Sequence, residues 1–205
     1  MTAQFSDFYE SLDPDSLKRG KQFEHFVKWF LKADPEWATQ VDQVWLWDEW
    51  PGRWGADCGI DLVFRHKNGD DWAVQSKCYS PDYDITKHDV DKFLSESNRP
   101  SIQHRLLIAT TDGIGANAKQ VCDAQEKPVV RFLLSDVEKS ALDYPANFES
   151  LSQGKLKHSW AVVIRRDLKT ARQNKGYLRN LQLSRICGVQ RNTSYARNHA
   201  SGYAG

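Results

Sequence analysis

The chain has 205 residues, of which 40% are hydrophobic and 12% aromatic. This length suits one domain of roughly 150 residues plus an appendage, and two full domains are not expected. All apolar runs are shorter than the roughly 18 residues that a membrane helix needs, so we expect a soluble protein.

The net charge of +1 hides an uneven distribution along the chain. Residues 1–150 hold 17 Lys or Arg and 26 Asp or Glu, a net charge of −9, whereas residues 151–205 hold 11 and 1, a net charge of +10. The sequence therefore predicts an acidic globular part and a basic tail. Because the tail has one short apolar run and no sustained periodicity, we expect it to be loosely ordered.

The N-terminus and the cysteines indicate the compartment. The first 16 residues are acidic and lack the basic, apolar and small-residue regions of a secretory signal. The cysteines form no C-x-x-C pair, which argues against a zinc knuckle or a redox dithiol. We expect a cytoplasmic protein.

The first predicted elements are a helix and a strand. In "GKQFEHFVKWFLKADPEW", five apolar residues from Phe23 to Leu31 recur at helical spacing, which predicts a helix over about 20–32. The segment "QVWLW" alternates in the manner of a strand of about five residues, and the turn-rich "PGRWG" follows it.

Strands and helices then alternate. The stretch "GIDLVFRHKNGDDWAVQSKCY", residues 59–79, predicts a hairpin that turns in "KNGD". Thr86, with Asp89 three residues later, predicts a helix start. The buried strands "RLLIATT" and "PVVRFLLS" flank a helix in "GANAKQVCDAQEK", and "DVEKSALDYP" suggests a last helix. This order predicts a mixed α/β sandwich.

The hairpin raises the main functional question, because a structural strand pair does not need an acid and a Gln-x-Lys. Gln75 and Lys77 share one face of their strand, and Ser76 points to the other. A two-residue turn would place Asp61 on the wrong face. A three-residue loop of residues 68–70 pairs Asp61 with Lys77 and Val63 with Gln75. We favour the second register, since it gives one apolar core face and one face for chemistry.

An acid, an amide oxygen and an ammonium on one sheet face suit a divalent metal. Mg²⁺ prefers hard oxygen ligands and retains waters, so one or two side-chain oxygens plus a substrate phosphate suffice. Asp61 would be the anchoring ligand, and Gln75 offers a neutral oxygen that weakens metal binding relative to Glu. Lys77 would orient and deprotonate a metal-held water or stabilise charge on the phosphate. This is the logic of phosphodiester hydrolysis.

"GIDLVF", followed 13 residues after Asp61 by "QSK", resembles the PD-(D/E)xK nucleases, specifically the Mrr-type branch with Gln in place of the acid. The nearest resemblance is to the N-terminal nuclease domain of type ISP restriction enzymes and related helicase-like proteins. It covers about residues 16–135 and implies an α/β restriction endonuclease-like fold, a mixed sheet flanked by helices, and we expect this nuclease domain to span residues 1–150. It also implies Mg²⁺, for which Mn²⁺ can substitute, and a role in restriction or phage defence. Glu24 matches an acid on the family's first helix, and Asp57 matches a loop acid.

The chain has no P-loop motif, so it encodes no motor of its own. The chain is expected to be either a fragment of a longer enzyme or a domain that acts alone. The resemblance implies DNA as substrate and, in the same or a longer chain, a motor ATPase and a methyltransferase or specificity module. Because residues 1–150 are acidic, we expect delivery to DNA by another module, with local phosphate contacts from a basic set of Arg53, Arg65, Lys67, Lys87 and Lys92.

Two other functions remain open from the sequence. One is a nucleic-acid-binding or assembly module that keeps the fold but does not cleave, which the absence of the second carboxylate supports. The other is a DNA-repair exonuclease of the same fold. Asp48 and Glu49 are interpreted as an exposed acidic turn.

Overall fold

The strands form one sheet in chain order, β1-β2-β3-β4-β5, in the part of the chain that the computed structural model describes, residues 4–56 and 59–152. The first three strands are antiparallel, and β4 and β5 run parallel to β3 and β4. The strands are β1 (Val41–Leu46), β2 (Leu62–His66), β3 (Asp71–Lys77), β4 (His104–Ala109) and β5 (Val129–Phe132). The mixed sheet flanked by helices confirms the predicted restriction endonuclease-like fold.

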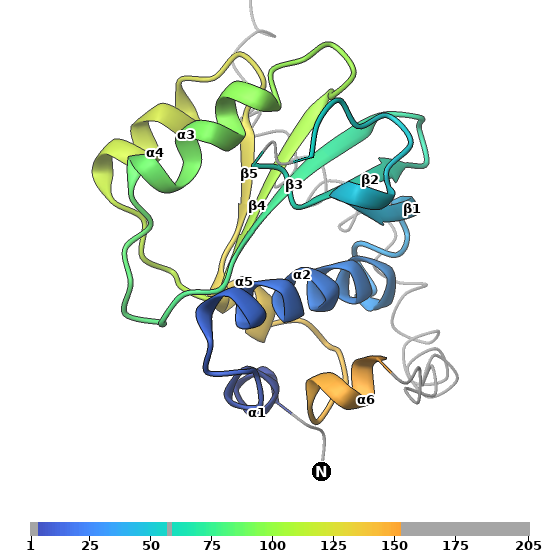
Figure 1. The fold of residues 1–205 in the computed structure, drawn as a ribbon, viewed down its shortest axis with the longest axis vertical. Helices are drawn as coiled ribbons and strands as arrows, with labels where there is room; N and C mark the ends of the chain where they lie inside the picture. Colours follow the sequence, from blue (N-terminus) through green and yellow to red (C-terminus); the bar gives the residue numbers. More distant parts are fainter. Residues whose placement is uncertain (1–3, 57–58, 153–205) are drawn as a thin grey trace, which may run out of the picture. The chain divides into compact units, whose positions relative to one another are not determined.

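Helices cover both faces of this sheet (Figure 1). Helix α2 contacts β1 and β3, while α3 and α4 pack together on the other side. The helices are α1 (Phe5–Glu10), α2 (Ser16–Ala33), α3 (Lys87–Glu96), α4 (Ala116–Asp123), α5 (Leu134–Glu138) and α6 (Phe148–Ser152), with a 3-10 turn η1 (Trp47–Glu49) after β1. None of the helices in the described ranges is long and apolar enough to cross a membrane.

The prediction of one core face and one open face was wrong. Phe64 and Trp72 stack on each other on the α2 side, next to Trp37, whereas Val63 and Ala73 belong to a buried cluster with α3. Helix α2 covers one face, and the other face is covered because β3 is followed by parallel strands, whose crossover helices α3 and α4 lie against the sheet. The side chains proposed for chemistry therefore project into a covered layer and are accessible only near the strand ends.

The hairpin register also differs from the prediction. Arg65 pairs with Asp71 and Val63 with Ala73, so the loop consists of residues 67–69 and the register is shifted by two. The Arg65 guanidinium binds the Asp71 carboxylate at 2.8 and 2.9 Å, which favours this pairing over the predicted one. A shift of two preserves the faces, because side chains alternate with a period of two. Gln75 and Lys77 thus share a face with Val63, as the predicted alternation requires.

Helices α2 and α3 each begin at side chains that cap the helix start. Asp15 caps α2 by accepting a hydrogen bond from the Lys18 backbone N at 3.0 Å, and α2 begins four residues before the predicted start. At the start of α3, Asp89 Oδ2 accepts from the backbone N and the Oγ1 of Thr86, at 2.8 and 2.7 Å. The helix predicted from Thr86 is confirmed.

Three short helices, α1, α5 and α6, complete the helical part of the fold. Helices α1 and α6 were not predicted, and α5 begins two residues before the segment suggested for a last helix. Phe5 and Phe8 of α1 contact Phe26 of α2, at ring-centroid distances of 5.4 and 4.6 Å. The predicted loose order of the basic tail lies outside the described residues, apart from residues 151–152 in α6.

Candidate active site

Asp61 lies just before β2, where its backbone joins two neighbouring elements. Its N–H donates to the Val74 carbonyl at 3.0 Å, and its carbonyl accepts from the Trp47 N–H at 2.8 Å. Its side-chain Oδ2 accepts three hydrogen bonds, from Gln75 Nε2 at 2.9 Å, Ser76 N at 2.7 Å and Ser76 Oγ at 3.0 Å. Because all three of these donors use Oδ2, Oδ1 is the carboxylate oxygen that the described residues leave for another ligand.

Ser76 is a site residue that the sequence interpretation missed. Strand alternation places Ser76 on the α2 side and Gln75 on the α3 side, so the two were not expected to share a partner. They do so because Asp61 lies beyond the last paired residue of β2, Leu62, and its carboxylate reaches over the edge of the ladder.

Gln75 is 6% exposed and uses its amide nitrogen on Asp61. Its carbonyl oxygen Oε1 is therefore the atom available to a cation. Lys77 ends β3 on the same face, is half-buried, and has its Nζ 6.0 Å from the centre of the Tyr79 ring. Its backbone carbonyl accepts from Thr110 N at 3.0 Å, which fixes this strand end to the segment after β4.

Tyr79 connects this strand end to helix α3. Its hydroxyl donates to Asp89 Oδ1 at 2.7 Å, and its carbonyl accepts from the Tyr9 hydroxyl at 2.9 Å and Thr110 Oγ1 at 2.6 Å. Burial and the Asp89 carboxylate both raise the pKa of the Tyr79 hydroxyl. Tyr9 and Thr110 thus hold the Tyr79 backbone carbonyl, and Asp89 of α3 holds its protonated hydroxyl.

Glu24 projects from α2 into the same electrostatic environment. Burial, and then the negative charges of Asp61 and Asp48, raise the pKa of Glu24, while Lys21 opposes the rise. Lys21 Nζ lies 3.0 Å from both carboxylate oxygens of Glu24. The structure therefore joins Asp61 and Gln75 by a hydrogen bond, and the charges of Asp61 and the exposed Asp48 act on Glu24, whereas the predicted position Asp57 lies outside the described residues.

The donor set fits a magnesium ion held by few protein ligands. Among the described residues, no three His, Cys, Asp or Glu side chains are grouped as for a dedicated metal cage. Asp61 Oδ1 and Gln75 Oε1 are the hard oxygens that the 2.9 Å hydrogen bond between Gln75 Nε2 and Asp61 Oδ2 does not use. Mg²⁺ accepts such sites, since it keeps waters and takes further oxygens from a phosphate.

The cations predicted to contact DNA lie at different places in the fold, and two of them lie away from Asp61. Arg65 and Lys67 lie at the turn end of the hairpin, at the opposite end of β2 from Asp61. Lys67 Nζ binds the Thr39 carbonyl at 2.9 Å, and Lys87 pairs with Asp91 at 2.6 Å on α3. Of the remaining two, Arg53 is exposed after η1, and Lys92 of α3 is exposed and lies against Gly59, two residues before Asp61.

Most of the chain matches the model of a known protein family. A family model described as restriction endonuclease, of the Mrr catalytic type, matches residues 32–153, more than half of the chain. The chain belongs to this restriction endonuclease family. The match covers Asp61, Gln75 and Lys77, and it confirms the resemblance inferred from "GIDLVF" and "QSK". Glu24 lies before the matched range.

Two solved structures are similar to this restriction endonuclease domain. The first is the ATP-dependent type ISP restriction-modification enzyme LlaBIII bound to DNA, with 31% identity and a TM-score of 0.55 over 62% of this chain and 8% of that one. The second is the DNA modification-dependent restriction endonuclease AspBHI, with 16% identity and a TM-score of 0.43 over 68% of this chain and 35% of that one. No curated protein matches the chain. This chain spans a small part of LlaBIII, and the likeness to a type ISP enzyme confirms the sequence resemblance.

Proposed function

We propose that this restriction endonuclease domain hydrolyses DNA phosphodiester bonds with Mg²⁺, for which Mn²⁺ can substitute. The observation that carries the proposal is the hydrogen bond of 2.9 Å between Gln75 Nε2 and Asp61 Oδ2, which joins the two proposed metal ligands at the hairpin end where Lys77 ends β3. Endonuclease action is favoured over exonuclease action, because the family is that of restriction endonucleases.

Each residue of the site has a distinct task. Asp61 Oδ1 and Gln75 Oε1 would hold the metal, which when bound lowers the pKa of a water and neutralises phosphate charge. Ser76 fixes the orientation of the Asp61 carboxylate through two hydrogen bonds to Oδ2. Lys77 orients the attacking water and stabilises the negative charge that develops on the phosphate. We propose that Glu24 assists from α2, where burial and the negative charge of Asp61 raise its pKa.

The acidic part of the protein needs help to reach DNA. Residues 1–150 carry a net charge of −9, which disfavours a polyanion, whereas residues 151–205 carry +10 and would attract phosphates. We propose that residues 1–150 form the nuclease domain and that another module delivers it. A motor ATPase and a methyltransferase or specificity module, in the same or a longer chain, are the proposed partners, since LlaBIII is an ATP-dependent restriction-modification enzyme.

A binding module that does not cleave is the second candidate, and Gln75 is the observation in its favour. A neutral amide gives the site one negative charge fewer than a second carboxylate would, and metal affinity depends on ligand charge. Such a module would keep the fold and the DNA surface without hydrolysing DNA.

Plasmid nicking separates the candidates. We expect the parent protein to nick supercoiled plasmid with Mg²⁺ or Mn²⁺ and not with EDTA, and we expect Asp61→Ala and Lys77→Ala to lose this activity. Equal background nicking by all three proteins would favour the binding module. Cleavage of linear DNA with no action on circular DNA would favour an exonuclease.

A further inference from the structure

Helix α2 carries a basic stripe, defined as Lys18, Lys21, His25, Lys28 and Lys32. The spacings of three, four, three and four residues place all five side chains on one side of the helix, within about 80° at 3.6 residues per turn. Lys28 is partly buried, whereas the other four are exposed. The stripe lies opposite the apolar residues that α2 buries against the sheet.

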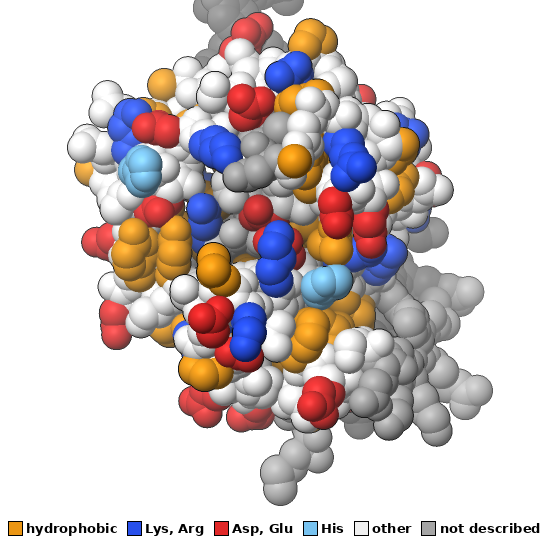
Figure 2. All heavy atoms as spheres, viewed as in Figure 1, with side chains coloured by type: hydrophobic (Ala, Val, Ile, Leu, Met, Phe, Trp, Pro, Cys, Tyr) orange, Lys and Arg blue, Asp and Glu red, His pale blue; other side chains and the backbone are white. Residues whose placement is uncertain are grey.

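This stripe is an exception in an acidic protein. Helix α2 contains five Lys or Arg and one Glu, although residues 1–150 as a whole have a net charge of −9. Figure 2 shows basic side chains and a histidine interspersed with acidic ones across the centre of the view, the region that α2 crosses in Figure 1. A cationic stripe on one helix within an acidic surface fits a polyanion that contacts the protein along that helix.

The stripe runs beside the candidate active site. Glu24, the single acid of α2, lies on the flank of the stripe and is bound by Lys21 at 3.0 Å. Further along the helix, Lys28 pairs with Glu49 of η1, the turn whose backbone also holds Asp61. An anion that follows the stripe therefore passes the carboxylates of Glu24 and Asp61.

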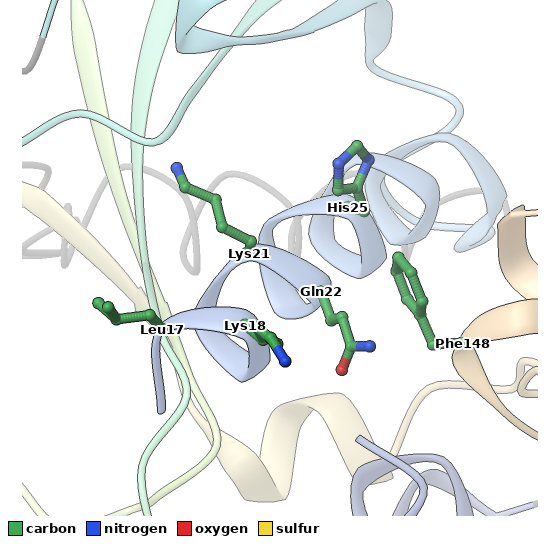
Figure 3. A pocket seen from close by; sticks show the side chains of 6 residues that line it. All are labelled: Leu17, Lys18, Lys21, Gln22, His25 and Phe148. Carbon is green, nitrogen blue, oxygen red and sulfur yellow. The ribbon is translucent and has the colours of Figure 1, made fainter. Parts of the chain in front are cut away.

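The N-terminal end of the stripe borders a shallow hollow of about 410 Å³ (Figure 3). Its lining combines the cations Lys18 and Lys21 with His25 from α2, while Phe148 of α6 forms the opposite wall. The rings of His25 and Phe148 contact each other edge to face, with centroids 6.1 Å apart. The hollow offers open room beside three of the five basic groups.

We propose that the basic stripe of α2 binds the phosphate backbone of duplex DNA and lays one strand along the helix toward Asp61. From Lys18 to Lys32 the stripe spans about 21 Å at 1.5 Å per residue, the axial length of about six nucleotides of one strand at 3.4 Å each. This inference rests on the proposed function, since it supplies the path by which a substrate strand reaches the site.

The ion pairs of Lys18 and Lys21 do not prevent these side chains from binding phosphate. Lys18 lies 3.9 Å from Asp13 and its side chain is 71% exposed, and the Lys21 side chain is 76% exposed. Exposed pairs of this kind contribute about 0–1 kcal/mol, so a phosphate can replace the carboxylate partner. Replacing Lys18 and Lys32 also leaves Lys21 and Glu24 unchanged.

The test is the salt dependence of duplex binding by the full chain in EDTA, where no cleavage occurs. The double variant Lys18→Gln/Lys32→Gln is compared with the control Lys119→Gln/Lys139→Gln, which removes the same charge from exposed sites on α4 and after α5. We expect the stripe variant to lower the slope of log affinity against log salt by about 2, at about 0.9 per lost phosphate contact, while the control keeps the parent slope. Lys18→Arg/Lys32→Arg should also keep it.

Equal slopes for the stripe variant, the control and the parent would overturn the proposal, and so would an absence of parent binding at low salt. Far-UV circular dichroism and thermal unfolding verify that the variants are folded. Nicking by the parent with Mg²⁺ is measured separately. An absence of nicking counts against the proposed hydrolysis, whereas an unchanged slope counts against the stripe.

Discussion

Gln75 donates its amide hydrogen to Asp61 Oδ2 at 2.9 Å, in the place where a second carboxylate would repel Asp61. The amide thus holds in position the acid that we propose as a metal ligand. Asp61 Oδ1 and Gln75 Oε1 take no part in this hydrogen bond. Gln75 is therefore a positioning residue as well as a proposed metal ligand.

Gln75→Glu should lower the thermal stability of the metal-free protein and raise its affinity for Mg²⁺. The variant loses the hydrogen bond and places two carboxylates together, so we expect thermal stability in EDTA to fall. Added Mg²⁺ should raise its melting temperature more than that of the parent, because the site gains a charge. Differential scanning calorimetry across a Mg²⁺ series measures this. A Mg²⁺-dependent rise no larger than that of the parent would argue against a metal at this position.

Asp89 should make stability depend on acid pH. Burial opposes its ionisation, but hydrogen bonds from Thr86, Tyr79 and Tyr83 outweigh this effect and lower its pKa to about 2. A folded pKa below the unfolded value gives stability that is complete above about pH 4 and lost as pH falls toward 2. Asp89→Asn should cost about 1 kcal/mol at pH 7, as expected for losing a helix-start interaction, and progressively less in acid. Urea unfolding at several pH values tests this, and a constant difference would contradict it.

Arg105 should be essential for folding stability. It is 0% exposed, and its guanidinium binds the Leu94 and Lys127 carbonyls at 3.0 and 2.8 Å and Ser97 Oγ at 2.7 Å. Arg105→Met leaves these buried acceptors without donors, at about 1–3 kcal/mol each, so we expect a loss of about 3 kcal/mol in urea unfolding. The exposed control Arg99→Met should lose about 1 kcal/mol or less. Equal losses would show that the buried network adds no stability.

Tyr79 should position Lys77 through its ring rather than its hydroxyl. The ring centre lies 6.0 Å from Lys77 Nζ, a distance at which a cation–π contact contributes about 0.5–1 kcal/mol. Tyr79→Leu should therefore slow single-turnover nicking about two- to fivefold, while Tyr79→Phe keeps the rate. If the two variants slow nicking equally, the hydroxyl bond to Asp89 is the feature that matters.

The hairpin shows what its sequence could and could not reveal. Alternation correctly placed Gln75 and Lys77 on one face, because a register shift of two leaves the faces unchanged. The loop itself was misplaced by one residue, since "KNGDD" accommodates three-residue loops at 67–69 and at 68–70. The ion pair of Arg65 with Asp71 distinguishes them, and it depends on side-chain geometry.

Two other features of the site were missed for different reasons. Ser76 reaches Asp61 only because that acid leaves the strand ladder, which no periodic pattern encodes. The basic stripe of α2 was present in the sequence as cations spaced by three and four residues, but the helix was interpreted from its apolar side alone. Covered faces on both sides of β3 were likewise indicated by the continuous apolar run of its parallel neighbour β4.

The most direct measurement for the central claim is a double-mutant cycle in single-turnover plasmid nicking with Mg²⁺. Asp61→Asn and Lys77→Met should each slow nicking by about 10²-fold or more, as expected for removing a charge that stabilises the transition state. The exposed control Asp42→Asn should keep the parent rate. If the two residues act on the same phosphate, the double variant should be no slower than the slower single variant. Losses that multiply, or single variants that nick as fast as the parent, would contradict a shared site.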